Sequence, residues 1–252
     1  MGSQDNLPKE RVQKHGQVSQ NRVQKKSRIS LNFCLLQVEF YSCLPTLQHR
    51  DDMLMTKSFT AQLCILYQLA YALDNNLQEG KSKLLDLSLV VGSDLDSYST
   101  TLPALAHKMR NKKEFYFLAR GVNFAVADEG ALKLKEVAYV HAEGMPAGEL
   151  KHGTLALIES GTPVIAICPL DYTYEDSLAN IMEAKARGAY VVGVSNAQSK
   201  IFDDSIKISS CEEILYPLVT AIPLQLLAYY SAIARGLDPD KPRNLAKSVT
   251  VK

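Results

Sequence analysis

Residues 129–153 gather more groups suited to acid–base chemistry than any other part of this 252-residue chain. They read EGALKLKEVAYVHAEGMPAGELKHG, with carboxylates, lysines and two histidines in a predicted helix followed by a loop. At helical spacing, Glu129, Lys133 and Glu136 share one face, so one lysine can reach two carboxylates. A positioned carboxylate of this kind can move a proton beside a carbonyl group. The same ion pairs also occur on helix faces that meet only solvent, which is the more frequent case.

The elements around this segment must position its charged face. Apolar spacing predicts helices at residues 56–73, 81–109 (broken at Pro103), 124–140, 174–187 and 214–235, and strands at 115–118, 163–167, 190–194 and 205–209. Alternating short strands and helices predict a parallel sheet covered on both faces. In the 124–140 helix, the small apolar face should pack on that sheet, and the charged face, which ends at Val140, should point outward or into a cleft. The small apolar face consists of Ala127, Ala131, Leu134 and Ala138.

Composition excludes several classes of protein. The net charge of +1 gives no reason to expect binding to nucleic acid or to a membrane surface. The five cysteines form neither a CxxC pair nor a metal-like spacing with histidine, which predicts small core hydrophobes in a reducing compartment and no bound metal. The apolar run at residues 31–44 contains Glu39 and is too short to span a bilayer. We therefore predict a soluble cytoplasmic protein.

The first 30 residues differ from the rest, with seven Lys or Arg against two acidic residues and no aromatic residue. Such a segment buries little surface, which predicts disorder. An RNA-binding tail is the alternative. A mitochondrial-type presequence fits less well, because such segments normally lack acidic residues.

A second segment, residues 238–252, reads DPDKPRNLAKSVTVK. With EGALKLKE, HAE and GELKHG in order before it, the sequence resembles, over residues 56–251, the C-terminal isomerase portion of the glucosamine-6-phosphate synthase family, the isomerizing glutamine–fructose-6-phosphate aminotransferases. The resemblance implies a complete SIS (sugar isomerase) domain with a flavodoxin-like α/β fold at residues 108–252. Residues 51–107 then read as helices left from a partial first SIS domain, and residues 1–50 as a basic segment unrelated to the family.

By this resemblance, the chain acts in amino-sugar biosynthesis, where fructose 6-phosphate and glutamine become glucosamine 6-phosphate and glutamate without a cofactor. Glu136 matches the carboxylate that shuttles a proton between C1 and C2, and Lys133 a neighbouring active-site lysine. Lys247 matches the tail lysine that forms a Schiff base with the sugar. His152 matches the ring-opening histidine, which in the family reaches into the partner subunit's site and so implies a homodimer. Substrate-binding positions are assigned to Thr56, Gly121 and Ala246.

Each of these residues also has a possible structural role without catalysis. Lys247 on a polar tail could be simply solvated, His152 could cap the end of a helix, and His141 reads as structural. Gly121 and the Ser195–Asn196 turn lie where the carboxyl ends of parallel strands meet, which is where ligands bind in such sheets.

Departures from the family pattern leave the activity open. The chain contains no SxSGET-type phosphate-binding loop, has Met53-Leu54-Met55 where relatives carry small residues, and begins Met1-Gly2 where relatives begin Met-Cys. We therefore expect an incomplete enzyme with weak or no activity alone. The alternatives are a module that binds fructose 6-phosphate or glucosamine 6-phosphate without turnover, and a non-catalytic partner of a full-length synthase.

Overall fold

The structure is a computed structural model that describes residues 56–245. The predicted basic segment at residues 1–50, together with Ala246 and Lys247, lies outside these described residues. The described chain begins with two helices, α2 (Thr56–Leu73) and α3 (Leu77–Lys108), and continues as an alternation of strands and helices.

Five parallel strands form one sheet in the order β2-β1-β3-β4-β5. Neighbouring strands pair in parallel along their length. For example, Glu114 of β1 lies opposite His141 of β2, and Tyr116 of β1 lies opposite Val164 of β3. This order is that of flavodoxin-like sheets, in which the strand order reverses between β1 and β3. The predicted fold class is confirmed. The strands are β1 (Glu114–Ala119), β2 (His141–Pro146), β3 (Pro163–Ile167), β4 (Tyr190–Ser195) and β5 (Asp204–Lys207).

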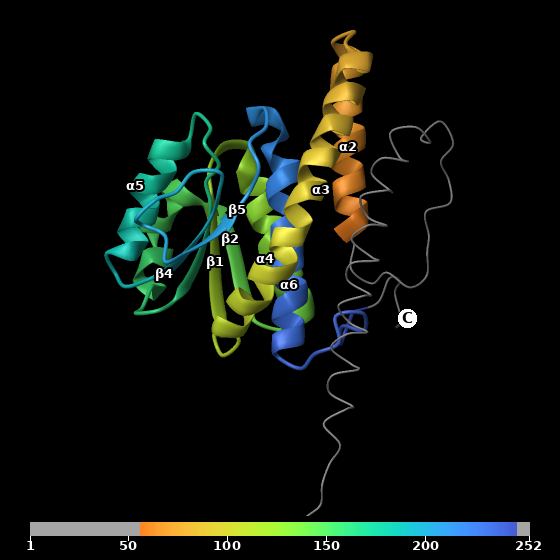
Figure 1. Cartoon of the computed structure of the whole chain (residues 1–252). Helices are drawn as coiled ribbons and strands as arrows, with labels where there is room; N and C mark the ends of the chain where they lie inside the picture. The colour runs from red at the N-terminus through yellow and green to blue at the C-terminus, as the bar shows by residue number, and fades with distance from the viewer. Residues whose placement is uncertain (1–55, 246–252) are drawn as a thin grey trace, which may run out of the picture.

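Helices cover both faces of the sheet (Figure 1). Because side chains alternate along a strand, Phe115 and Phe117 of β1 pack into one core with α3, α4 (Phe124–Ala138) and α6 (Tyr216–Ala234). Tyr116 and Leu118 of the same strand pack into a second core with α5 (Tyr174–Lys185). The turns between elements include four short 3₁₀ segments, η1 (Gly121–Asn123), η2 (Ala147–His152), η3 (Thr154–Leu157) and η4 (Glu213–Leu215).

Helix α6 lies at the centre of the larger core. The stretch Glu213–Ala234 is long and apolar enough to cross a membrane by length and composition, yet 61% of its most apolar window is buried within the protein. It packs against α3 and α4. Its apolar character is therefore accounted for by burial in the core.

One strand was missed by the sequence analysis, which read residues 141–153 as a loop. Strand β2 pairs with β1 at the edge of the sheet, and only Ala142 and Met145 of its residues are buried. Its sequence HAEGMP lacks the β-branched residues that mark strands. Gly144 fits here because a Cβ at this position would lie 2.6 Å from the backbone nitrogen of Asp128 in α4.

The predicted break at Pro103 is wrong, because α3 continues through it to Lys108. A proline within a helix removes one backbone hydrogen bond and normally kinks or ends the helix. Here Leu102, Leu105 and Ala106 are buried on either side of the proline. Packing of this turn into the core outweighs the local cost.

Helix α2 forms where it was predicted, but most of its predicted apolar face does not pack. Leu66, Leu69 and Leu73 are exposed, while Cys64 and Ala61 are the buried residues. The α2–α3 pair projects past the end of the sheet (Figure 1), so the last two turns of α2 have few partners among the described residues.

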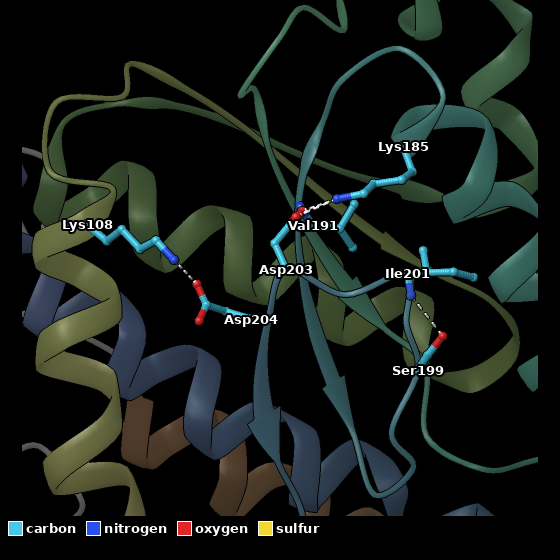
Figure 2. A network of polar contacts seen from close by, with 7 residues as sticks. All are labelled: Lys108, Lys185, Val191, Ser199, Ile201, Asp203 and Asp204. Carbon is cyan, nitrogen blue, oxygen red and sulfur yellow. Dashed lines mark hydrogen bonds and ion pairs between the residues drawn. The ribbon is translucent and has the colours of Figure 1, made fainter.

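Two neighbouring aspartates tie the β5 edge of the sheet to helices on opposite sides (Figure 2). Lys108 at the end of α3 pairs with Asp204, and Lys185 at the end of α5 pairs with Asp203. Asp203 also accepts a hydrogen bond from the backbone nitrogen of Val191, at 2.8 Å. Burial raises the pKa of Asp203, but the Lys185 ammonium and the Val191 N–H outweigh it, so the pKa lies below its ordinary value.

Candidate functional site

The predicted charged face of α4 forms a compact ionic cluster, which we call the α4 cluster: Glu129, Lys133 and Glu136. The Lys133 ammonium donates to Glu136 Oε2 at 2.7 Å and lies 3.8 Å from Glu129 Oε1. The Lys133 and Glu129 side chains are only 3% and 9% exposed, whereas Glu136 is 21% exposed. The interpretation as a solvated helix face is therefore wrong, and Glu136 is the member most open to a ligand.

Helix α6 covers this cluster, which explains the burial. Burial is the largest effect on the Glu129 carboxyl and raises its pKa. The Lys133 charge lowers the pKa, the Glu136 charge raises it, and a hydrogen bond from Gln225 of α6 lowers it. The pKa of Glu129 is raised above its ordinary value as a result. Glu129 Oε1 has no hydrogen-bond partner among the described residues. A buried carboxylate in this condition depends on its neighbouring ammonium, because an unpaired charge in the interior is strongly disfavoured.

The C-terminal segment approaches the same end of α4. Tyr139, the residue after α4, accepts a hydrogen bond from the backbone nitrogen of Arg243 at 2.7 Å. The Arg243 guanidinium lies over the Tyr139 ring, 4.3 Å from its centroid. Tyr139 follows Glu136 by three residues, so this contact brings Arg243 to the end of α4 that carries Glu136.

The two predicted tail residues, Ala246 and Lys247, lie beyond Leu245, where the described chain ends.

His152 and Gly121 lie at the other edge of the sheet. Helix α4 runs from the carboxyl edge, where Gly121 lies, to the amino edge, where β2 begins. His152 ends η2, after β2 has returned to the carboxyl edge, and its side chain is exposed. Because β2 has six residues at about 3.3 Å each, its two ends lie about 20 Å apart. Thr56 is the first residue of α2.

Side-chain hydrogen bonds link the loops at the carboxyl edge to one another. Asn196 accepts from the Leu170 backbone nitrogen at 2.7 Å and donates to Tyr216 at 3.0 Å. Asn123 donates to Asp171 at 3.2 Å. Gly121 has a positive φ of 57°, and a Cβ there would lie 2.8 Å from the Tyr172 hydroxyl. These polar groups hold loops together at the position where such folds usually bind ligands.

Three residues of the site were not found from the sequence: Gln225, Tyr139 and Arg243. Gln225 had a usable signal, since it is a polar residue within the apolar stretch AIPLQLLAYY. Tyr139 and Arg243 are separated by 104 residues, and nothing local predicts their contact. Within residues 56–245, no three potential metal ligands gather into a group.

Comparisons with known proteins agree on the family. The profile of the SIS domain matches residues 108–235. A glutamine–fructose-6-phosphate aminotransferase (isomerizing) from Nostoc sp. strain PCC 9229 is 46% identical over 211 residues, covering 79% of this chain and 34% of that protein. The protein of the same name from Thermococcus kodakarensis is 44% identical over 207 residues, covering 78% of this chain and 34% of that protein.

Among solved structures, the C-terminal domain of glucosamine-fructose-6-phosphate aminotransferase from Francisella tularensis has a TM-score of 0.68 and 32% identity. The match covers 75% of this chain and 56% of that one. The chain thus spans about a third of the length of the curated relatives that it matches.

Proposed function

Because the chain belongs to the SIS domain family, we propose that it forms the sugar-phosphate isomerising site of a glutamine–fructose-6-phosphate aminotransferase. The observation that carries the proposal is the α4 cluster, in which Lys133 is held between two carboxylates on the helix whose end Arg243 of the C-terminal segment contacts. An inert helix face has no need to bury a lysine and a glutamate.

The proposed chemistry divides among residues at that end of α4. Lys247 attacks C2 of open-chain fructose 6-phosphate, and water leaves as the Schiff base forms. Ammonia then displaces the lysine from C2, which frees the Lys247 amine. Glu136 removes the proton from C1 and returns it to C2, while the proton of the C1 hydroxyl passes to the nitrogen, so that C1 becomes the aldehyde of the amino sugar. On the free ketone the same transfer, with the hydroxyl proton passing to the C2 oxygen, gives glucose 6-phosphate. Lys133, 2.7 Å from Glu136 Oε2, orients that carboxylate. Thr56, Gly121 and Ala246 remain proposed substrate contacts.

A second copy of the chain is part of the proposal. His152 is the proposed ring-opening base, and it follows β2, which spans about 20 Å from one edge of the sheet to the other. Its exposed position at the carboxyl edge supports a role in the site of a neighbouring subunit. We therefore propose a homodimer in which each site combines Glu136 of one chain with His152 of the other.

The test is conversion of fructose 6-phosphate to glucose 6-phosphate by the purified chain, followed by coupling to a dehydrogenase. Glu136→Gln and Lys247→Ala should each lower the rate by about 10²-fold or more, the usual contribution of a positioned acid–base group. Glu143→Gln is the matched control, because Glu143 is an exposed carboxylate on β2, outside the α4 cluster.

Each outcome separates the alternatives. Conversion that both variants abolish supports the proposed site. Saturable binding of fructose 6-phosphate without conversion would favour a phosphosugar-binding module instead. Absence of both binding and conversion from a folded sample would refute the proposal.

A further inference from the structure

Helices α4 and α6 pack closely beside the α4 cluster. Gly130 lies at this contact, where a Cβ would lie 2.9 Å from Leu224 Cδ1 of α6 and 3.0 Å from the Phe117 ring of β1. The lack of a side chain at Gly130 therefore lets the two helices approach each other here. Glu129 and Gln225 are the neighbours of Gly130 and Leu224 in the chain, and Gln225 donates a hydrogen bond to the Glu129 carboxylate across this contact.

Gln225 is suited to a buried carboxylate for a reason of charge. It is the one amide side chain of α6, and no residue of α6 is charged. An apolar residue at this position would take a hydrogen bond away from a buried carboxylate, which is costly. A lysine or arginine would compete with Lys133 for Glu129. The amide N–H donates to the carboxylate and adds no charge to the cluster.

The Lys133 ammonium is not shared equally between its two carboxylates. It lies 2.7 Å from Glu136 Oε2 but 3.8 Å from Glu129 Oε1, which is beyond hydrogen-bond distance. Glu129 Oε1 is buried and has no hydrogen-bond partner in the described part of the chain. A Glu129 carboxylate free to rotate would therefore move toward the ammonium and draw it away from Glu136. The hydrogen bond from Gln225 opposes this rotation.

We propose that Gln225 is a positioning residue, which holds the Glu129 carboxylate against α6 and so keeps the Lys133 ammonium on Glu136. The consequence for catalysis rests on the proposed function above, in which Glu136 moves the proton; the hold on Glu129 does not. Gln225 acts on the sugar only through the three charged residues of the α4 cluster.

The variant Gln225→Met tests this role with little change in packing. Methionine is unbranched, like glutamine, and fills irregular space in a core, so the variant should fold. Gln68→Met is the matched control, because Gln68 is a half-buried glutamine on a different helix, α2. Glu129→Gln, alone and combined with Gln225→Met, removes the carboxylate through which Gln225 is proposed to act.

The first measurement requires no activity. Crystal structures of the wild-type chain and of Gln225→Met give the distances from Lys133 Nζ to the two carboxylates. In the variant, Nζ should lie about 3 Å from a Glu129 oxygen and beyond hydrogen-bond distance of Glu136. A Lys133–Glu136 contact that is the same in both structures would overturn the proposal.

The second measurement is the rate of fructose 6-phosphate isomerisation. The kcat should fall about 10-fold in Gln225→Met, as expected from losing a hydrogen bond to a charged group, with a smaller change in KM, and should be unchanged in Gln68→Met. In the Glu129→Gln background, Gln225→Met should cause no further fall, because the competing charge is absent.

Two kinetic outcomes would count against the role in catalysis. Equal falls in the wild-type and Glu129→Gln backgrounds would mean that Gln225 acts only through the packing of α6, which would overturn the positioning role. No conversion by the wild-type chain would refute the proposed function, and the crystal structures would then decide the hold on Glu129 by themselves.

Discussion

The carboxyl edge of the sheet and helix α4 use polar residues in opposite ways. At the carboxyl edge, Asn196 and Asn123 form hydrogen bonds with neighbouring loops, so that these polar groups are paired with one another. Along α4, the cluster buries Lys133 and Glu129 while one carboxylate oxygen lacks a hydrogen-bond partner among the described residues.

This difference indicates which region serves mainly structure and which is the stronger candidate for chemistry. Polar groups that are fully paired stabilise a fold but have little capacity left for a ligand. Buried charges that depend on a few neighbours are costly to keep and are often found at functional sites. In this chain side-chain hydrogen bonds tie together the loops at the carboxyl edge, and the buried ion pairs lie on α4.

Lys133→Met should have the largest effect on stability. It leaves Glu129 buried without its ammonium, and removing one partner of a buried ion pair typically costs about 3–5 kcal/mol. Urea denaturation of the variant measures this loss. The double variant Glu129→Gln/Lys133→Met should regain about 1–2 kcal/mol, because the uncompensated charge is then gone. A Lys133→Met midpoint equal to that of the wild-type chain would mean that the cluster is solvated.

Asn196→Ala tests whether the polar residues at the carboxyl edge of the sheet serve stability alone. The substitution leaves the Leu170 N–H and the Tyr216 hydroxyl without their partner, and we expect a loss of about 1–2 kcal/mol in the free energy of unfolding. The rate of isomerisation per folded molecule should stay within about twofold of the wild-type rate, because the residue does not contact the proposed site. A large fall in rate with stability intact would assign chemistry to this edge and reverse the comparison.

The contributions of Glu129 and Asp203 to the free energy of unfolding should change with pH in opposite directions. The pKa of Glu129 is raised above its ordinary value of 4.5, so the folded state holds this proton more tightly, and its contribution to stability falls as pH rises through and beyond 4.5. The pKa of Asp203 is lowered below 3.8, so its contribution is present above that pH and is lost as pH falls through the folded-state pKa.

Urea midpoints measured from pH 3 to pH 7 on the wild-type chain, Glu129→Gln and Asp203→Asn isolate these contributions. Relative to Glu129→Gln, the wild-type chain should lose stability with rising pH. Relative to Asp203→Asn, it should lose stability only at the acid end. Parallel curves for all three proteins would contradict both assignments.

Tyr190→Phe should have the smallest effect. The Tyr190 hydroxyl is buried and lacks a hydrogen-bond partner among residues 56–245, so removing it should leave the free energy of unfolding unchanged or raise it by up to about 1 kcal/mol. Thermal denaturation checks this. A clear loss of stability would mean that the hydroxyl has a partner after all, such as an ordered water.

Most of the fold followed from local patterns. Strand β3 and helix α2 have the predicted bounds, and β1, β4, α4 and α5 lie within a few residues of theirs, because runs of apolar residues with strand or helix spacing are properties of short segments. The sequence predictions failed where contacts between distant residues determine the secondary structure. Strand β2 exists because β1 offers it an edge, and α3 continues past Pro103 because the surrounding turn is buried.

For the candidate site, the sequence by itself determined that Glu129, Lys133 and Glu136 share one helical face, since a period of 3.6 residues requires it. Only the tertiary structure decided that this face is covered by α6, that Gln225 supplies a hydrogen bond, and that Arg243 returns to Tyr139. These outcomes depend on contacts between distant residues: Gln225 is 96 positions from Glu129 (225 − 129), and Arg243 is 104 positions from Tyr139. Such contacts follow from how layers pack around a common core, and no local sequence pattern records them.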